Sequence, residues 1–308
     1  MPVSEKEEHF KAILQALLVT FLWSTSFIII KFGLKEIPPL TFAGLRYFLA
    51  FIFLLPLLLR KKYFDEIKNL GRKEYPKLIL YGFVFIGLTQ GAQFAGLSLL
   101  PSVIVSLMLN FTPMVVAVMG YLLLSEKPTT LQWFGAVLFL GGVIIYFLPV
   151  NLTSGEWLGL IIMTFGILAN AGSSILGRQI NRQRLLSPLV ITIISIGVGS
   201  VFLLIAGLAI QGISSISLLN IVLLFWMAGV NTAYAFTLWN KTLRSLTAME
   251  SSIINGTMLI QIGVLAWVFL GEAISLKEGL GMIVAMLGAV LVQIKLKKIR
   301  YKFPSSKQ

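Results

Sequence analysis

Few side chains of this sequence are suited to covalent or metal chemistry. Cysteine is absent from the 308 residues, the single histidine is His9 and the single aspartate is Asp65. His9 lies in a short charged N-terminal segment, and Asp65 lies in a charged loop. The missing cysteines exclude disulfides, thiolate nucleophiles, iron–sulfur clusters and c-type haem attachment. With no cysteine and only one histidine and one aspartate, most hydrolytic and metal chemistry is excluded as well.

Arg46 is the most informative candidate for binding a solute. It lies seven residues after Pro39 in an apolar stretch, about 10 Å along a helix. A basic group at the centre of a membrane helix costs about 2.5–3.5 kcal/mol, so it should face a cavity or a partner. The guanidinium suits a carboxylate; alternatively it caps backbone carbonyls or pairs with asparagine and glutamine. We favour the structural role and keep Arg46 among the candidate solute-binding residues.

Neutral polar and aromatic side chains recur at similar depth in other apolar stretches. Amides and hydroxyls can replace the water around a polar solute, and aromatic rings can stack on it. The same groups also hydrogen-bond between helices, at about 0.6 kcal/mol per bond on average. We expect about half of them to touch solute. The candidates besides Arg46 are Trp23, Ser26, Gln90, Gln93, Asn110, Asn170, Asn231, Tyr234 and Asn255.

The composition places these residues in membrane helices. Hydrophobic residues make up 57% of the chain and charged residues only 12%, against about 25% charged in soluble domains. A spanning helix needs about 20 apolar residues, and the apolar stretches predict an all-α integral membrane protein with ten transmembrane helices. The predicted spans are 12–33, 38–59, 77–98, 101–124, 130–149, 157–177, 188–210, 218–239, 247–270 and 277–294.

The basic residues predict the orientation of the ten helices. Cytoplasmic loops carry an excess of lysine and arginine, and 21 of the 25 basic residues fall on the side that holds both ends of the chain. Both termini are therefore expected in the cytoplasm, with tails over residues 1–11 and 295–308. We expect the basic loops to attract anionic lipid headgroups at the cytoplasmic face, and short, separated basic segments do not suggest a nucleic-acid partner.

The two halves of the chain repeat each other. Residues 125–143 and 271–289 align at an offset of 146, which pairs Glu126 with Glu272 and Gly142 with Gly288. We therefore expect two five-helix repeats, over 12–149 and 150–294. Because five is odd, the second repeat enters the membrane from the opposite side. Inverted repeats are typical of secondary transporters, with the solute site near the midplane between the halves.

The sequence resembles the ten-helix EamA-type permeases of the drug/metabolite transporter superfamily. The marks of the resemblance are WSTSF at 23–27, PPL..F..LR at 38–46, Pro113, and the turns LLLSEKPTTLQWFG at 122–135 and FLGEAISLKEGLG at 269–281. The second half departs from the pattern, since no arginine matches Arg46. The resemblance implies a metabolite exporter or facilitator with a cavity lined by spans one, three, four, six, eight and nine.

Three residues are expected to have structural roles: Pro113, Glu126 and Glu272. The repeated spacing of the two glutamates, each just before a helix capped by Thr129 or Ser275, indicates a structural turn. Catalysis by either carboxylate is not expected.

The leading hypothesis is a carrier that moves small polar metabolites, such as amino acids, across the cytoplasmic membrane by alternating access. It needs no cofactor, and the sequence is compatible with a monomer. An enzyme is disfavoured because phosphoryl and prenyl transferases need acidic clusters to hold Mg²⁺. A multidrug or other metabolite exporter of the same superfamily and a non-transporting receptor or scaffold are the alternatives. Because the spans lack a carboxylate relay, we predict a facilitator or exchanger rather than a proton antiporter.

Overall fold

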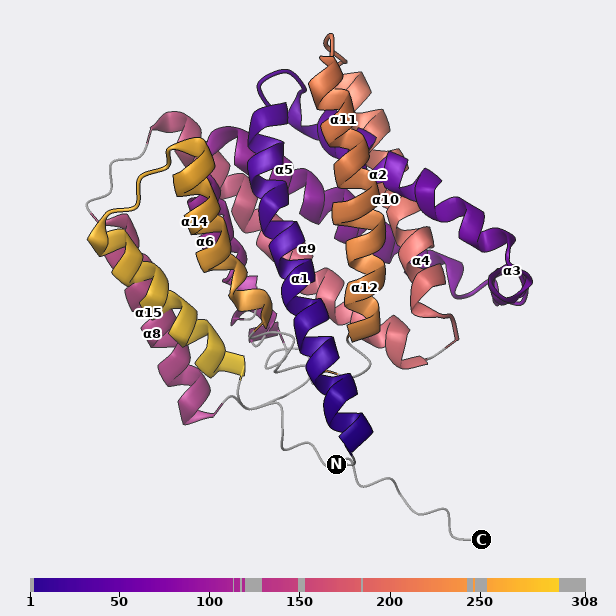
Figure 1. Cartoon of the computed structure of the whole chain (residues 1–308), viewed down its shortest axis with the longest axis horizontal. Helices are drawn as coiled ribbons and strands as arrows, with labels where there is room; N and C mark the ends of the chain where they lie inside the picture. The colour runs from indigo at the N-terminus through magenta and orange to yellow at the C-terminus, as the bar shows by residue number, and fades with distance from the viewer. Residues whose placement is uncertain are drawn as a thin grey trace, which may run out of the picture.

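The computed structural model is a bundle of helices (Figure 1). It describes residues 3–112, 114–116, 118–119, 129–148, 153–183, 185–242, 246 and 254–293, and within these residues no strand is present. Pro113, Glu126 and the tail at 295–308 lie outside the described residues. The prediction of an all-helical fold is confirmed.

In the first half of the chain, the residues that the structure describes form seven α-helices and two segments of other helical type. The helices are α1 (Val3–Gly33), α2 (Pro39–Leu54), α3 (Lys61–Lys68), α4 (Tyr75–Gly82), α5 (Gly91–Leu99), α6 (Ser102–Leu109) and α8 (Thr130–Phe147). A 3₁₀ segment, η1 (Leu55–Leu59), extends α2, and a π-helical segment, η2 (Phe83–Gln90), joins α4 to α5.

The described residues of the second half form six helices and a second π-helical segment. The helices are α9 (Ser154–Gln183), α10 (Pro188–Ile210), α11 (Leu218–Trp226), α12 (Ala235–Thr242), α14 (Met258–Leu270) and α15 (Leu276–Gln293). The π-helical segment η3 (Met227–Tyr234) joins α11 to α12. In Figure 1, α1 begins and α15 ends toward the same side of the bundle.

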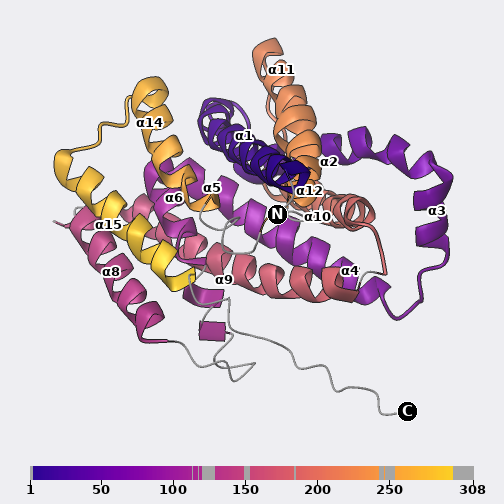
Figure 2. The same cartoon turned by 60° about the horizontal axis from the view of Figure 1, so that its bottom comes forward.

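Seven helical stretches of the described residues are long and apolar enough to cross a membrane. They are Glu7–Gly33, Pro39–Leu59, Tyr75–Leu99, Thr130–Phe147, Ser154–Gly177, Pro188–Ile210 and Leu218–Trp239. Each stretch coincides with one of the predicted spans, and most of their ends differ by no more than a few residues. The basic loop after the second stretch folds as α3, which lies across the direction of α1 at the edge of the bundle (Figures 1 and 2).

Of the predicted span at 101–124, the structure describes residues 101–112, 114–116 and 118–119, and a turn interrupts its helix. Helix α6 ends at Leu109, and Asn110 and Phe111 form a turn. The cause lies in the sequence, since Pro113 has no N–H to donate to the carbonyl of Leu109, four residues earlier, and its ring crowds that carbonyl. Asn110 therefore sits at the end of α6, in a turn after which helical residues resume at Thr112.

Helices α8 and α15 pack backbone to backbone through glycines. A Cβ atom added to Gly142 would lie 2.6 Å from the carbonyl oxygen of Gly281, and one added to Gly288 would lie 2.7 Å from that of Gly135. Because Gly142 faces Ala285 while Gly288 faces Phe139, residue numbers rise along one helix as they fall along the other. The two helices are therefore antiparallel, and only glycine fits at their contact.

Helices α2 and α10 form a second close antiparallel pair. A Cβ atom on Gly44 would lie 2.5 Å from the Cα of Leu204, and one on Gly207 would lie 2.5 Å from the nitrogen of Thr41. Small residues let membrane helices approach closely and gain van der Waals contacts. This pair fixes the depth at which α2 presents Arg46 to the rest of the bundle.

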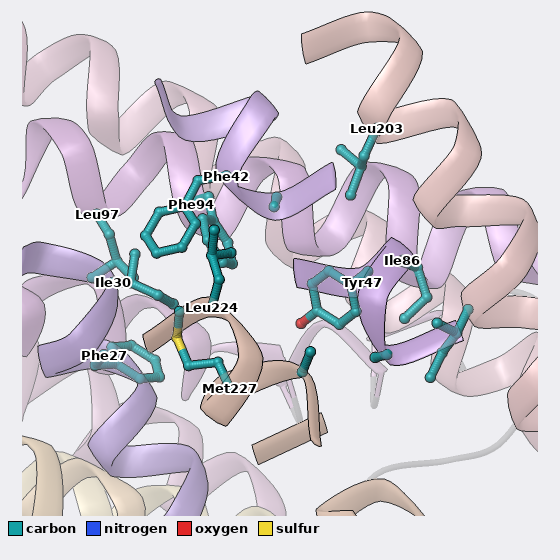
Figure 3. Close-up of a cluster of buried hydrophobic side chains, with 14 of the residues drawn as sticks. Phe27, Ile30, Phe42, Tyr47, Ile86, Phe94, Leu97, Leu203, Leu224 and Met227 are labelled. Carbon is teal, nitrogen blue, oxygen red and sulfur yellow. The ribbon is translucent and has the colours of Figure 1, made fainter. Parts of the chain in front are cut away.

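The largest buried apolar cluster is drawn in Figure 3. It contains Tyr47 and Phe94, whose rings lie beside the guanidinium of Arg46. Phe42 and Tyr47 of α2 and Phe94 of α5 are almost fully buried in it. The rings of Phe42 and Phe94 meet edge to face at 5.3 Å, and those of Tyr47 and Phe94 at 6.5 Å. A polar group in this cluster is thus shielded from water, which strengthens its electrostatic interactions.

Candidate functional site

The Arg46 side chain is buried, with 3% of its surface exposed, and it connects three helical segments. Its Nε donates to the Oγ1 of Thr232 in η3 at 3.0 Å, and its Nη2 donates to the Oγ of Ser26 in α1 at 3.2 Å. The guanidinium also lies 5.3 Å from the ring centre of Tyr47 and 5.9 Å from that of Phe94. Among the described residues, no carboxylate lies within ion-pair distance of it.

Asn231 joins the same network from η3 and is completely buried. Its Nδ2 faces the carbonyl oxygen of Leu22, the Oγ1 of Thr25 at 3.0 Å and the Oγ of Ser26 at 2.9 Å. The hydroxyl of Ser26 is therefore shared by Asn231 and Arg46. The Oδ1 of Asn231 is buried without a hydrogen-bond partner in the described part of the chain.

Gln90 connects to this network through Tyr47. The Tyr47 hydroxyl donates to the Oε1 of Gln90 at 2.7 Å, and Tyr47 follows Arg46 directly in α2. Gln90 is the last residue of η2, and Asn231 and Thr232 lie within η3. Both π-helical segments thus carry residues of the site. π-helical turns are rare and occur frequently at functional sites.

Trp23 lies one turn before Ser26 on α1, next to a group of aromatic rings. Its ring centre is 5.3 Å from that of Phe236 and 5.2 Å from that of Trp239. Phe236 in turn lies 6.0 Å from Phe85 of η2. The Nε1 of Trp23 is buried without a partner among the described residues, so the ring offers a free donor beside an apolar surface.

The remaining predicted site residues lie apart from this network. Asn110 donates to the carbonyl of Ser106 in its own helix at 2.9 Å, and Asn170 donates to the Oγ1 of Thr112 at 3.1 Å. Gln93 is half-buried one turn beyond Gln90, while Tyr234 and Asn255 are exposed on the isolated chain. The structure therefore brings together Arg46, Ser26 and Asn231, with Gln90 attached through Tyr47 and Trp23 nearby.

Some polar partners within the same helices were not predicted from the sequence. Thr25 and Thr232 are direct members of the network, and Tyr47 links it to Gln90. A second buried network lies between α1 and α14, where Gln261 accepts from the hydroxyl of Ser24 at 2.9 Å. The signal in the sequence was the hydroxyl-rich segment WSTSF, which places polar groups on successive faces of one helix turn.

Glu272 holds the start of α6 from a distant part of the chain. Its carboxylate accepts from the backbone nitrogens of Ser102 at 3.0 Å and Val103 at 3.3 Å. Lys31 of α1 donates to the carbonyl of Leu100 at 2.6 Å beside this contact. A carboxylate at a helix N-terminus satisfies unpaired N–H groups and interacts favourably with the helix dipole.

The predicted N-caps of α8 and α15 are confirmed. Thr129 and Gln132 form a reciprocal capping box at the start of α8. At the start of α15, Ser275 donates its backbone N–H to Glu278 at 2.7 Å and accepts from the nitrogen of Glu278 at 3.2 Å. Equivalent positions of the two halves thus begin their helices in the same way.

Long apolar helices surround a buried hydrogen-bond network, which consists of neutral polar groups and one arginine. Together these features define a multi-pass integral membrane protein with a polar interior site. In the described residues, no cluster of histidine and acidic side chains could hold a metal ion. The model of the EamA-like transporter family matches residues 10–148 and again residues 157–294. The chain therefore belongs to the EamA-like transporter family of the drug/metabolite transporter superfamily and is a membrane transporter.

Relatives of known or named activity cover most of the chain. It is 26% identical over 273 residues to the S-adenosylmethionine/S-adenosylhomocysteine transporter of Chlamydia trachomatis serovar L2, covering 85% of this chain and 83% of that protein. It is 27% identical over 245 residues to a probable amino-acid metabolite efflux pump of Escherichia coli K12, covering 74% and 76% respectively. A crystal structure with 14% sequence identity matches the fold, with a TM-score of 0.67 over 92% of this chain and 98% of that one.

Proposed function

We propose that the protein is a carrier with ten transmembrane helices in two inverted repeats, and that it works by alternating access. Three observations support this arrangement. The family model matches twice, both π-helical segments fall in the third helix of their half, and the antiparallel pair α8 and α15 meets through glycines at equivalent repeat positions. Inverted repeats meeting around a midplane site are typical of alternating-access transporters.

The proposed location is the cytoplasmic membrane, with both termini in the cytoplasm. The side that carries 21 of the 25 basic residues is then cytoplasmic. On this orientation, Trp239 and Phe236 lie on the cytoplasmic side of Asn231, while Lys31 and Glu272 lie toward the outside. The Arg46 network lies between these two groups, at the depth expected for a solute site.

The proposed solutes are small zwitterionic metabolites, namely amino acids and related compounds. The single observation that carries this proposal is the buried guanidinium of Arg46, which has no carboxylate partner in the described residues. A buried charge without a counter-ion is strongly unfavourable, and its two hydrogen bonds use two of five N–H donors. A solute carboxylate would supply both the charge and the missing acceptors.

The relatives support the same class of solute. S-adenosylmethionine and the amino acids share an α-amino and an α-carboxyl group, although their remaining parts differ. Lipophilic cations would require a buried acidic group, and Arg46 is instead a buried base. We therefore favour amino-acid-like solutes over cationic drugs, moved outward or down their gradient by a facilitator or exporter.

Flux through purified protein in sealed liposomes tests the proposal. A panel of amino acids, S-adenosylmethionine and cationic dyes would be loaded and their release followed by mass spectrometry, with and without a pH gradient. We expect release of a few amino-acid-like solutes that falls at least about tenfold in Arg46→Ala, since a charge-assisted hydrogen bond contributes about 1.5–3 kcal/mol. Arg60→Ala, in the loop outside the bundle, is the matched control.

Three results would overturn the proposal. Release of cationic dyes without amino acids would refute the solute class. Equal flux in Arg46→Ala and Arg60→Ala would remove Arg46 from the site. Saturable binding without any flux, from protein shown to be folded, would favour a receptor over a carrier.

A further inference from the structure

The orientation of the Asn231 amide is fixed by what surrounds it. Its Nδ2 faces three acceptors on α1, one of which, the carbonyl oxygen of Leu22, can only accept. Turning the amide over would bring its own oxygen against that carbonyl, so the nitrogen must face α1. The Oδ1 is consequently held away from these three acceptors.

This Oδ1 is an unmet hydrogen-bond acceptor in a buried position. Asn231 is 0% exposed, and its oxygen has no partner within the described residues. Buried polar atoms are nearly always paired, so an exception in a native structure calls for an explanation. One explanation is a ligand that brings a donor to this place.

The unmet acceptor lies beside the unmet positive charge. Asn231 and Arg46 both hydrogen-bond to the hydroxyl of Ser26, at 2.9 Å and 3.2 Å. Thr232, the next residue of η3, accepts from the Nε of the same guanidinium. The site thus has unused N–H donors on the Arg46 guanidinium and an unused acceptor on the Asn231 amide. The hydroxyl of Ser26 lies between these two side chains.

We propose that the Oδ1 of Asn231 accepts a hydrogen bond from the ammonium group of a solute whose carboxylate is bound by Arg46. An α-amino acid carries these two groups on one carbon atom and so matches both unmet groups of the site together. Asn231 is then a specificity-determining residue that separates amino acids from simple carboxylates. This inference rests on the proposed function and assigns the second half of its solute recognition.

The experiment compares each amino acid with the same molecule lacking its amino group. The probes are L-phenylalanine with 3-phenylpropanoate, and L-leucine with 4-methylpentanoate, loaded into proteoliposomes at pH 8. Protein-free liposomes are measured in parallel to subtract passive leakage. The measured quantity is the ratio of the two fluxes within each pair, for wild type, Asn231→Ala and Asn231→Gln.

Thr237→Ala is the matched control. Thr237 lies on α12, where its hydroxyl donates to the carbonyl of Ala233 in η3 at 2.7 Å, and no hydrogen bond among the described residues joins it to Asn231 or Arg46. Its substitution removes a hydroxyl close in sequence to Asn231 and leaves the Oδ1 in place. We expect the wild type and Thr237→Ala to prefer the amino acid about tenfold or more, and Asn231→Ala to bring the ratio close to one.

The outcomes separate this inference from the proposed function. Equal wild-type fluxes within each pair would refute the role of Asn231 while leaving the role of Arg46 intact. An equal loss of both fluxes in Asn231→Ala would show that the residue only joins helices. If the wild type moves cationic dyes but no amino acid of the panel, the proposed solute class fails and this inference with it. If Asn231→Ala does not fold, the wild-type ratio and Asn231→Gln still decide.

Discussion

The contact between α8 and α15 predicts opposite effects on stability when either of two adjacent glycines, Gly141 and Gly142, is replaced by alanine. A methyl group on Gly142 would lie 2.6 Å from the carbonyl oxygen of Gly281, whereas nothing lies within 4 Å of one on Gly141. Both substitutions to alanine gain about the same helix propensity, up to about 1 kcal/mol. Any difference between the two variants therefore measures the interhelical contact alone.

The size of that difference follows from the distance. Ordinary contacts begin near 3.4 Å, and the methyl group would lie closer still to the backbone nitrogen of Ala285. Helix α15 must therefore withdraw by more than about 0.8 Å, or the methyl group remains compressed. Overpacking of this kind usually costs about 1–3 kcal/mol. We expect Gly141→Ala to be as stable as wild type or slightly more stable, and Gly142→Ala to unfold about 1–3 kcal/mol more easily than Gly141→Ala.

Denaturation of the purified protein in detergent by a titration with sodium dodecyl sulfate, followed by tryptophan fluorescence, measures both free energies. Gly288→Ala gives an independent check, because its methyl group would lie 2.7 Å from the carbonyl oxygen of Gly135 across the same pair. It should lose as much stability as Gly142→Ala. If Gly142→Ala and Gly141→Ala unfold at the same point, the helices do not meet as described.

Two carboxylates near the helix ends outside the solute site should have smaller effects. Glu272→Gln removes the charge that faces the N-terminus of α6 and should lower the unfolding free energy by about 0.5–1 kcal/mol; no change in the same titration would mean that the charge at this end contributes nothing. The pKa of Glu36 is lowered by hydrogen bonds from the side chain of Asn220 and the backbone of Ser217. Its contribution is thus present at neutral pH and lost as the pH falls through the lowered pKa. The melting temperature of wild type should therefore drop more between pH 7 and pH 3 than that of Glu36→Gln, and identical curves would contradict this.

The sequence predicted the long helices well because their ends are marked by charges, prolines and caps. One predicted span, 188–210, begins at Pro188 and ends before Gln211. The observed α10 has the same bounds, Pro188–Ile210. The π-helical segments η2 and η3 could not be predicted, since hydropathy does not distinguish a hydrogen-bond register of four residues from one of five. The turn after α6 could have been predicted from Pro113 by the missing N–H.

The sequence predicted the depth of the polar side chains in the membrane helices, but it did not predict their hydrogen-bond partners. A span that is apolar on every face carries no amphipathic signal, so hydropathy gives the depth of a side chain and not the direction in which it points. For this reason Asn110 and Asn231 looked equivalent in the sequence, although only Asn231 shares a hydrogen-bond partner, Ser26, with Arg46. The ambiguity over Arg46 arose in the same way, because its hydroxyl partners lie on helices far away in the chain.

The glycine contact between α8 and α15 also bears on assembly. At the repeat offset of 146, Gly142 corresponds to Gly288, and Phe139 corresponds to Ala285. Gly142 faces Ala285, and Gly288 faces Phe139, so the two contacts are the same contact made in both directions. That reciprocity is the geometry of an isologous interface in a two-fold dimer, realised here inside one chain. An isologous interface is closed: once its two patches meet, neither can accept a further copy. Any higher oligomer of this protein must therefore form through surfaces other than this glycine seam.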